Sequence, residues 1–281
     1  MAAGFPAAHE PSGADGVFSC GIDCGSSYCK GALLRNGAVL ALSCRPSGWN
    51  MEENSRLVLE ELFGFQRLPF NRLAVKIAVT GYGREKAALA ISALHGRGCG
   101  TLTEISAHAL GACSLSPGAR TVIDAGGQDC KVIAVEDGRV LDFLMNDKCA
   151  AGSGRFLQAA ALRLEADAAD WELMLSCGKE ARINSVCAVF AESEIIGLLA
   201  CGARREDVLF GAAASVCRRI ASLARGLPVK EPAVLCGGLS QSPAFCRILS
   251  GVLGVEVQAV PNGRWAGAAG AAIFAASQAA L

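Results

Sequence analysis

The chain contains an internal repeat that limits the folds open to it. Residues 17–42 give a short apolar strand ending in Asp, a glycine loop, a second strand, an Asn-Gly turn and a third strand. Residues 121–147 repeat this order about a hundred positions later, with an Asp-Gly turn before the last strand. Two copies of one strand-rich unit predict a chain built from two related lobes.

Segments with helical periodicity follow each copy of the repeat. Residues 52–65 are charged and amphipathic, and residues 154–164, 189–199 and 212–225 are also predicted to be helical. Two more strands are predicted, in AVKIAVTGYG (residues 74–83) and at the start of AVLCGGLSQSPAF (residues 233–245), where a glycine turn precedes a helix. This mixture of strands and helices predicts an α/β fold.

Composition narrows the function classes. A chain of 281 residues that is 52% hydrophobic can bury a proper core. Its 26 basic and 26 acidic residues cancel, which argues against a broad nucleic-acid-binding surface. Residues 1–16 have no basic start and no apolar core, so we expect a disordered leader rather than a signal peptide. Because no uncharged apolar run reaches membrane-spanning length, a soluble protein without a membrane partner is expected.

The cysteine content indicates a reducing compartment. The fourteen cysteines include no C-x-x-C pair and lack the regular spacing of a disulfide framework. Most of them are therefore predicted to be small core residues of a cytoplasmic protein. Cys24 and Cys130, which lie at the glycine loops, are predicted to be such space-fillers, although exposed thiols there could oxidise and disturb ligand binding.

The glycine loop of the first repeat has the composition of a phosphate site. Gly25 lets the backbone approach a phosphate closely, and the amides and hydroxyls of Ser26 and Ser27 can donate hydrogen bonds to it. Asp23 can hold a magnesium ion, usually through water. Lys30 lies in the following strand and is predicted to reach the phosphates.

The second repeat carries the same kind of glycine loop after a strand, and a third glycine loop follows later in the chain. Asp124 leads into Gly126, Gly127 and Gln128, and facing loops of this kind would hold the phosphate tail of a nucleotide between two lobes. The turn of Gly237 and Gly238, with Gln241 beside it, is a candidate shelf for the base or ribose. A single strand-end glycine is weak support, but three loops at repeated positions are stronger. No G-x-x-x-x-G-K-[ST] is present, which excludes a P-loop enzyme.

The loop pattern resembles the acetate kinase, sugar kinase, Hsp70 and actin superfamily. Longer motifs resemble, more narrowly, the ATPase activators of 2-hydroxyacyl-CoA dehydratases, a family that includes the ATPase subunits of benzoyl-CoA reductases. These motifs are VTGYGR (79–84), TEISAHALGA (103–112), VIDAGGQD (122–129), MNDKCAAGSGRF (145–156) and SVCAVFAESEII (185–196). The likeness covers roughly residues 17–274, and the last two motifs are the most specific.

This resemblance implies a fold and a set of cofactors. The expected fold is two ribonuclease-H-like lobes with ATP or ADP and Mg²⁺ in the cleft between them. The first lobe is placed at residues 17–115, with a helix at about 265–281 packing back on it, and the second at residues 116–264. One 4Fe–4S cluster is expected to bridge a homodimer, with Cys149 and Cys187 of each subunit as its ligands.

The resemblance also implies a reaction. ATP hydrolysis would drive low-potential electron transfer from ferredoxin or flavodoxin to a dehydratase or related reductase component. Asp23 and Asp124 are the candidates for holding magnesium and positioning water, and Glu104 is a third candidate. Glu104 could instead be the capping-box carboxylate of a helix that starts after Thr101.

Two other functions remain open at this point. A sugar kinase resembling N-acetylglucosamine kinase would need a catalytic aspartate in the first lobe, and none stands out between Gly64 and Gly111. A nucleotide-binding regulator without a cluster would leave Cys149 and Cys187 as buried core residues.

Overall fold

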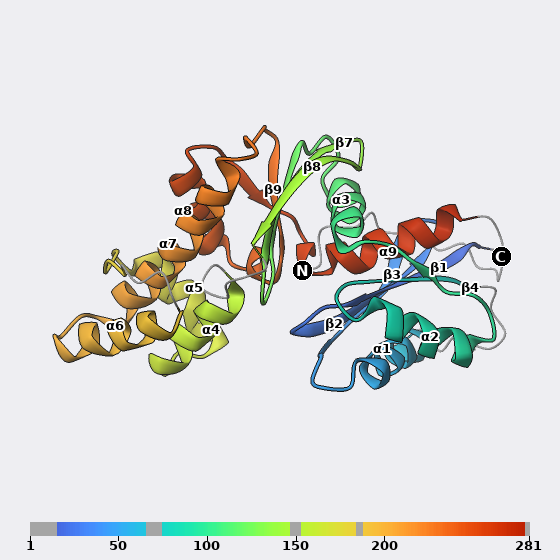
Figure 1. The fold of residues 1–281 in the computed structure, drawn as a ribbon, viewed down its shortest axis with the longest axis horizontal. Helices are drawn as coiled ribbons and strands as arrows, with labels where there is room; N and C mark the ends of the chain where they lie inside the picture. Colours follow the sequence, from blue (N-terminus) through green and yellow to red (C-terminus); the bar gives the residue numbers. More distant parts are fainter. Residues whose placement is uncertain (1–15, 66–74, 147–152, 184–187, 279–281) are drawn as a thin grey trace. The chain divides into compact units, whose positions relative to one another are not determined.

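The computed structural model describes residues 16–65, 75–146, 153–183 and 188–278. The chain divides into two compact units, each with its own sheet (Figure 1). Unit 1 comprises Met1–Gly118, Glu136–Val140 and Val260–Leu281, and unit 2 comprises Ala119–Val135 and Leu141–Ala259. Residues 1–15 of the predicted leader lie outside the described ranges.

Unit 1 is built on a mixed five-stranded sheet in the order β3-β2-β1-β4-β5. The first three strands form antiparallel hairpins, whereas β4 and β5 run parallel to β1. Their bounds are β1 Phe18–Cys24, β2 Tyr28–Arg35, β3 Ala38–Pro46, β4 Val75–Thr80 and β5 Gly100–Thr101. Every residue of β1 is buried, as expected for a central strand that is covered on both faces.

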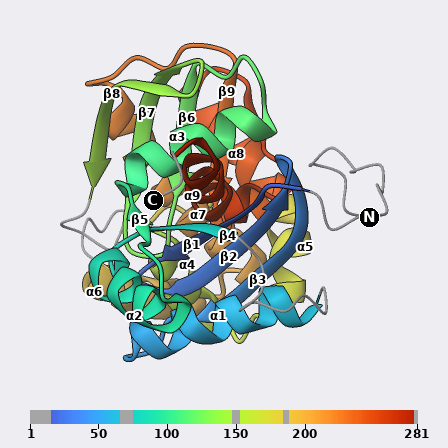
Figure 2. The ribbon, with the colours of Figure 1, turned by 90° about the vertical axis from the view of Figure 1, so that its right-hand side faces the viewer.

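Helices cover both faces of this sheet (Figure 2). α1 (Met51–Phe65) and α2 (Arg84–His95) lie on one face, where Val58 and Leu62 of α1 pack around Ile22 of β1. The other face is covered by α3 (Glu104–Leu115) and α9 (Ala266–Ser277). The C-terminal helix α9 is rich in Ala and Gly, and it packs directly on the central strands.

Unit 2 repeats the same sheet order, β8-β7-β6-β9-β10. Here β6 and β7 are antiparallel, and β9 runs parallel to both β6 and β10. The strands are β6 Thr121–Ala125, β7 Cys130–Glu136, β8 Arg139–Asn146, β9 Ala233–Gly237 and β10 Val257–Ala259. Because both sheets have the order expected of a ribonuclease-H-like lobe, the predicted α/β fold class is confirmed.

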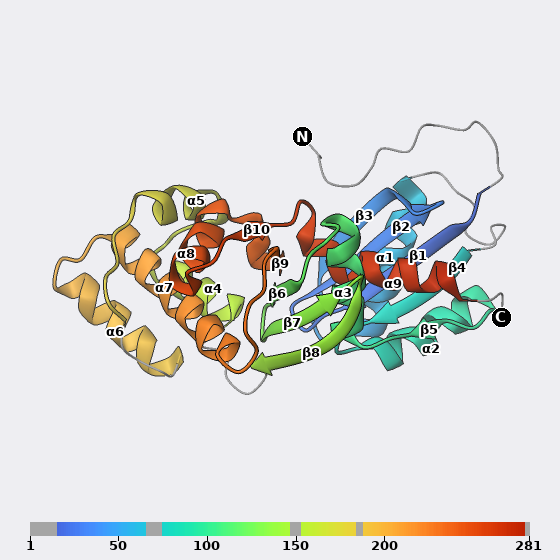
Figure 3. The ribbon, with the colours of Figure 1, turned by 90° about the horizontal axis from the view of Figure 1, so that it is seen from above.

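The helices of unit 2 are α4 Gly154–Arg163, α5 Ala168–Cys177, α6 Ala188–Ala200, α7 Arg205–Ala224 and α8 Pro243–Leu253. Figure 3 shows α7 and α8 beside the strands, with α4, α5 and α6 grouped around α7. Leu209 and Val216 of α7 belong to the same buried cluster as Ile123 of β6 and Phe245 of α8. None of the helices in the described ranges has the length and apolar character needed to cross a membrane.

The packing of α9 in unit 1 depends on glycine. A Cβ at Gly111 of α3 would lie 1.9 Å from the carbonyl oxygen of Ala266, and one at Gly270 of α9 would lie 1.9 Å from that of Ala107. The two helix backbones therefore touch directly, with no side chain between them. A Cβ at Gly21 would likewise meet the Ala268 oxygen at 1.9 Å, so α9 also rests on the backbone of β1.

Replacing Gly270 tests this contact. Alanine raises helix propensity, but at Gly270 the overlap with the Ala107 oxygen outweighs that gain. We expect Gly270→Ala to lower the free energy of unfolding by about 1–3 kcal/mol in chemical denaturation. Gly251→Ala is the matched control, because this exposed glycine of α8 has nothing within 4 Å of the added methyl. That variant is expected to gain about 0.5–1 kcal/mol, and equal effects at both positions would contradict the packing argument.

Candidate functional site

The first predicted phosphate loop joins β1 to β2. Asp23, near the end of β1, lies directly opposite Lys30 of β2, and the Lys30 Nζ lies 3.2 Å from the Asp23 Oδ2. Asp23 is buried, so the lysine supplies charge where water is excluded. Gly25, Ser26 and Ser27 form the turn between these two residues. The structure thus places all five predicted residues of this loop within one hairpin.

Two buried oxygens beside this loop have no hydrogen-bond partner among the described residues. They are the Oδ1 of Asp23 and the Oγ1 of Thr80, which face each other across the parallel pair β1–β4. An unsatisfied buried oxygen costs about 1–3 kcal/mol, so such atoms usually serve a ligand or a bound water. A carboxylate oxygen next to a hydroxyl suits a hard, hydrated cation such as Mg²⁺, and Asp23 therefore fits its predicted role.

Ser47, at the end of the β3 hairpin, holds the backbone of the first loop. Its Oγ donates to the carbonyl oxygen of Gly25 at 2.5 Å, and its N–H donates to the carbonyl oxygen of Ser27 at 3.0 Å. Position 25 also requires a residue without a side chain, because a Cβ there would lie 2.9 Å from the carbonyl oxygen of Tyr28. These contacts fix the loop in one conformation, which lowers the entropy cost of binding an anion.

The second loop joins β6 to β7 and repeats this geometry. Asp124 lies opposite Lys131, and the Lys131 Nζ is 3.1 Å from the Asp124 Oδ2 and 2.9 Å from the Asp129 Oδ2. Lys131 is among the largest fully buried side chains of the chain. Gly126 and Gly127, followed by the exposed Gln128, form the turn.

The second loop is also bound to the first turn of α4. The Gly154 N–H donates to the Gly126 oxygen and the Arg155 N–H donates to the Gly127 oxygen, each at 2.9 Å. Amides at the start of a helix have no partner within the helix, so the loop carbonyls satisfy them. The position of α4 is therefore set by the backbone of the phosphate loop.

Each aspartate is flanked by a glycine with positive φ from the neighbouring parallel strand. Gly237, the last residue of β9, has φ +83, and a Cβ there would lie 2.5 Å from the Asp124 Oδ1. Gly81, after β4, has φ +91, and a Cβ there would lie 2.7 Å from the Asp23 Oδ1. Only glycine leaves room for the carboxylate and also adopts this backbone conformation without strain.

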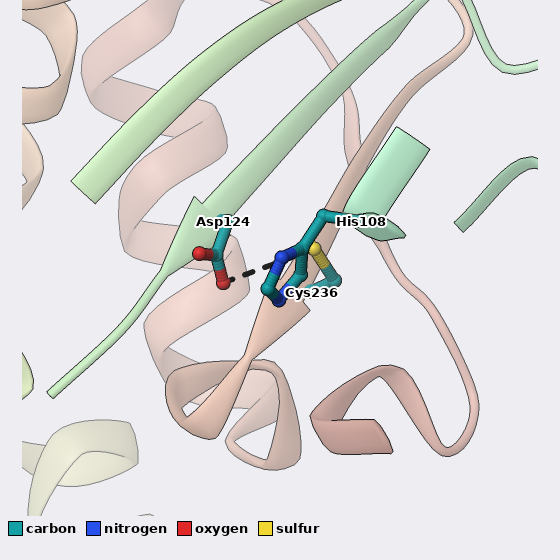
Figure 4. Close-up of side chains that lie close together, drawn as sticks. All are labelled: His108, Asp124 and Cys236. Carbon is teal, nitrogen blue, oxygen red and sulfur yellow. Dashed lines mark hydrogen bonds between the residues drawn. The ribbon is translucent and has the colours of Figure 1, made fainter. Parts of the chain in front are cut away.

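The third predicted loop begins at Gly237. Asp124 lies opposite Cys236 of β9, with the Cys236 Sγ 4.0 Å from its Oδ1 (Figure 4). Gly238 and Gln241 then form a short 3₁₀ helix in which the Gln241 Nε2 donates to the Gly238 oxygen at 3.3 Å. The structure thus places Gly237 against the second phosphate loop, and contact of Gly238 and Gln241 with a base or ribose remains a prediction.

Sequence reasoning missed three residues that the structure assigns to these loops. Lys131 is the counterpart of Lys30 and could have been found by aligning the loops, since each spells D-x-G-x-x-x-C-K, and Gly81, after β4, is the counterpart of Gly237. The third is Arg264, whose guanidinium lies 4.9 Å from the ring centre of Tyr28 in the first loop. Arg264 precedes α9 and has no counterpart in the repeat, so the sequence held no signal for it.

Thiols at both loops are buried rather than exposed. Burial raises the pKa of Cys130. A hydrogen bond with Cys24 raises the pKa of Cys29 well above its ordinary value, and burial adds to the effect. The thiols of Cys130 and Cys29 therefore stay protonated at neutral pH and are weak nucleophiles in the folded chain.

The predicted cap of the helix at Glu104 is wrong. Thr103, not Thr101, is the N-cap of α3, and its Oγ1 accepts from the Ser106 N–H at 3.1 Å. Glu104 is the first residue of the helix and cannot be the third-position carboxylate of a capping box. Its role as a third catalytic carboxylate remains a prediction.

The predicted cluster ligands, Cys149 and Cys187, lie outside the described residues. The helices that follow them are described, and α6 begins at Ala188, immediately after Cys187. Residues Phe156 of α4 and Ala191 and Ile195 of α6 share one buried cluster, and an Arg163–Glu192 ion pair joins the two helices. The two cysteine-bearing segments therefore lead into helices that pack on each other.

Comparison with known proteins identifies the class. The chain belongs to the BadF/BadG/BcrA/BcrD ATPase family, which it matches over residues 20–275. The 2-hydroxyisocaproyl-CoA dehydratase activator of Clostridioides difficile is 37% identical over 266 residues, which cover 94% of this chain and 96% of that protein. The (R)-2-hydroxyglutaryl-CoA dehydratase activating ATPase of Acidaminococcus fermentans is 38% identical over 266 residues, covering 94% and 99%.

Solved structures agree with this assignment. The activator of the 2-hydroxyisocaproyl-CoA dehydratase from Clostridium difficile with bound ADPNP has a TM-score of 0.84 at 36% identity, covering 92% of this chain and 94% of that one. A ROK family glucokinase from Streptomyces griseus has a TM-score of 0.60 at 17% identity, covering 92% and 98%. The kinase likeness shows a shared fold alone, in agreement with the predicted superfamily.

The buried lysines provide a test of the loop geometry. Lys131→Met leaves Asp124 and Asp129 without their cation, and we expect the free energy of unfolding to fall by about 3–5 kcal/mol. Lys30→Met is the matched control, because Lys30 is 13% exposed and pairs with one carboxylate, so its loss is expected to be smaller. Urea unfolding of both variants measures the difference, and an equal or reversed order would contradict the burial argument.

Proposed function

We propose that the chain is an ATP-hydrolysing activator that contains a 4Fe–4S cluster and acts as a homodimer. It drives low-potential electron transfer from ferredoxin or flavodoxin to a 2-hydroxyacyl-CoA dehydratase or a related reductase component. Family membership over residues 20–275 and the activators among its relatives support this proposal. The observation that carries it is the pair of backbone hydrogen bonds between the second phosphate loop and α4.

In this proposal the two loops bind the phosphate oxygens of ATP. The glycine and serine residues of the first loop donate to them, and Lys30 and Lys131 offset their charge. Asp23, with its unpartnered Oδ1 in a buried site, would hold Mg²⁺ and orient the attacking water. Bound Mg²⁺ supplies charge neutralisation of the phosphates.

The coupling step would pass from the second loop to α4. When the phosphates bound at the second loop change on ATP hydrolysis, the carbonyl groups of Gly126 and Gly127 would shift. The first amides of α4 would follow, because they are hydrogen-bonded to these two carbonyl groups. Cys149 lies on the segment before this helix, so the shift reaches the proposed ligand. The free energy available for shifting α4 is limited by the difference in nucleotide affinity between the two conformations of the loop.

Residues Cys149 and Cys187 of each subunit would hold the cluster, which supplies the one-electron redox chemistry. Two thiolates per chain complete a four-thiolate site only in a symmetric pair. Exposed apolar side chains on the helices that follow the two cysteines support such a pair: Leu162 of α4 is 77% exposed, and Phe190 and Ile196 of α6 are 70% and 51% exposed.

Asp23→Asn tests the catalytic proposal. The amide keeps the shape of the side chain but removes its charge, so we expect ATP hydrolysis and ATP-dependent reduction of the acceptor component to fall together by about two orders of magnitude. Asp137→Asn, in the exposed β7–β8 turn, is the matched control and should keep both rates. If the Asp23→Asn variant hydrolysed ATP at the native rate, the proposed catalytic role of Asp23 would be wrong.

Replacing the proposed ligands tests the cluster. Cys149→Ser and Cys187→Ser are expected to abolish iron binding and the brown colour after anaerobic purification, and to convert the dimer to monomers in light scattering. Cys177→Ser, at an exposed cysteine of α5, should keep iron, colour and mass. An iron-free native chain that runs as a monomer would contradict the proposal.

A further inference from the structure

Two cysteines face each other at the base of the first phosphate loop, and the proposed function gives them no role. Cys24 ends β1, Cys29 lies near the start of β2, and the two are direct cross-strand partners. Their Sγ atoms are 3.8 Å apart, and each residue is only 1% exposed. The turn of the loop, residues 25–27, lies between them, together with Tyr28, which begins β2.

The backbone at this position already suits a disulfide. Residues directly opposite each other in an antiparallel pair have Cα atoms about 4.5–5.5 Å apart. Disulfides bridge Cα separations of about 4.4–6.8 Å, with a sulfur–sulfur bond of about 2.05 Å. Closing the gap from 3.8 Å therefore requires a rotation of the side chains and a small adjustment of the two strand ends, while the strand pairing is kept.

The second loop shows that the fold does not need two thiols here. Its equivalent cross-strand pair is Ala125 and Cys130, which packs at the same position with a single sulfur. Both members of that pair are buried, as are Cys24 and Cys29. A small side chain thus meets the packing requirement, and the second thiol of the first loop is available for chemistry.

We propose that Cys24 and Cys29 form a redox-sensitive pair that a small peroxide oxidises to a disulfide across the base of the first phosphate loop. The Cys24 sulfur attacks a peroxide oxygen, the O–O bond breaks, and a sulfenic acid and water form. The second sulfur then attacks the sulfenic sulfur and expels a second water. The two thiols lose two electrons and two protons, and hydrogen peroxide is reduced to two molecules of water.

The disulfide would act on residues next to it. Asp23 and Lys30 are the adjacent cross-strand pair, so drawing the sulfurs together strains the register that holds their ion pair. The Cys24 carbonyl oxygen accepts from the Gly83 N–H at 3.0 Å, so a shift of Cys24 also reaches the segment that follows β4. Resting on the proposed function, this strain lowers nucleotide affinity.

Peptide mapping tests the bond itself. The full-length chain is treated with one equivalent of hydrogen peroxide, and the remaining thiols are alkylated under denaturing conditions. Lys30 is the first basic residue, so trypsin leaves Cys20, Cys24 and Cys29 in one peptide, whereas chymotrypsin cleaves after Tyr28 and separates Cys24 from Cys29. We expect the two chymotryptic peptides to remain joined until dithiothreitol is added.

Calorimetric titration with ADP and magnesium tests the consequence. Peroxide is expected to weaken ADP binding by the native chain at least about tenfold, corresponding to about 1.4 kcal/mol, and dithiothreitol to restore it. Cys29→Ala and Cys24→Ala should bind ADP equally before and after peroxide, whereas Cys20→Ala, at a buried cysteine of the same strand, should respond as the native chain does.

Separated peptides after oxidation, or a joined pair with unchanged ADP affinity, would overturn the proposal. A reduced native chain that binds no ADP would instead refute the proposed function, while the mapping would still decide whether the thiol pair forms its bond.

Discussion

A lysine opposite a buried aspartate anchors each phosphate loop to its sheet. Burying one such charge alone is costly, and the cross-strand register places its partner directly beside it. In each pair the lysine places a positive charge beside an aspartate that is buried away from water. The loops, their glycines and the flanking strands are arranged around these two ion pairs.

The two loops differ in what surrounds the shared geometry. Beside the first, the Asp23 Oδ1 and the Thr80 Oγ1 have no hydrogen-bond partner among the described residues, and Arg264 adds a positive charge next to Tyr28. In the second, Lys131 bridges two carboxylates. The first loop therefore has unused capacity for a cation and an anion, and the second is satisfied internally. In the proposed function, this difference would favour metal binding at the first loop and coupling to α4 at the second.

Much of this architecture could be predicted from the sequence, because repeats and strand-end glycines are local signals. The hairpins of both repeats, the helix at residues 52–65 and the phosphate loops all follow from patterns within about ten residues. The helix predicted at residues 212–225 begins earlier, at Arg205, where Glu206 and Asp207 favour a helix N-terminus and could have marked it.

Other features depended on contacts between distant segments. The helix α2 (Arg84–His95) was not predicted for a local reason, because the glycine-rich loop directly before it indicated irregular structure after β4. Arg264 reaches Tyr28 only after α9 has packed on unit 1, so no local pattern could indicate it. The cap of α3 shows a subtler limit. Thr101 and Thr103 both precede the helix, and the choice depends on strand β5, which ends at Thr101 and leaves Thr103 to begin the helix.

The link between the second loop and α4 consists of main-chain atoms, and this determines how it can transmit a change. Its donors are the amides of Gly154 and Arg155, so no side-chain substitution removes them. A Cβ on Gly154 would lie 3.1 Å from the Gly126 oxygen, closer than most such contacts, so a larger residue here would have to displace this oxygen by a few tenths of an ångström. Rigid, short contacts of this kind pass on small displacements with little loss, because packed interiors resist compression. A nucleotide-dependent shift at Gly126 and Gly127 would therefore move the start of α4 by a comparable amount.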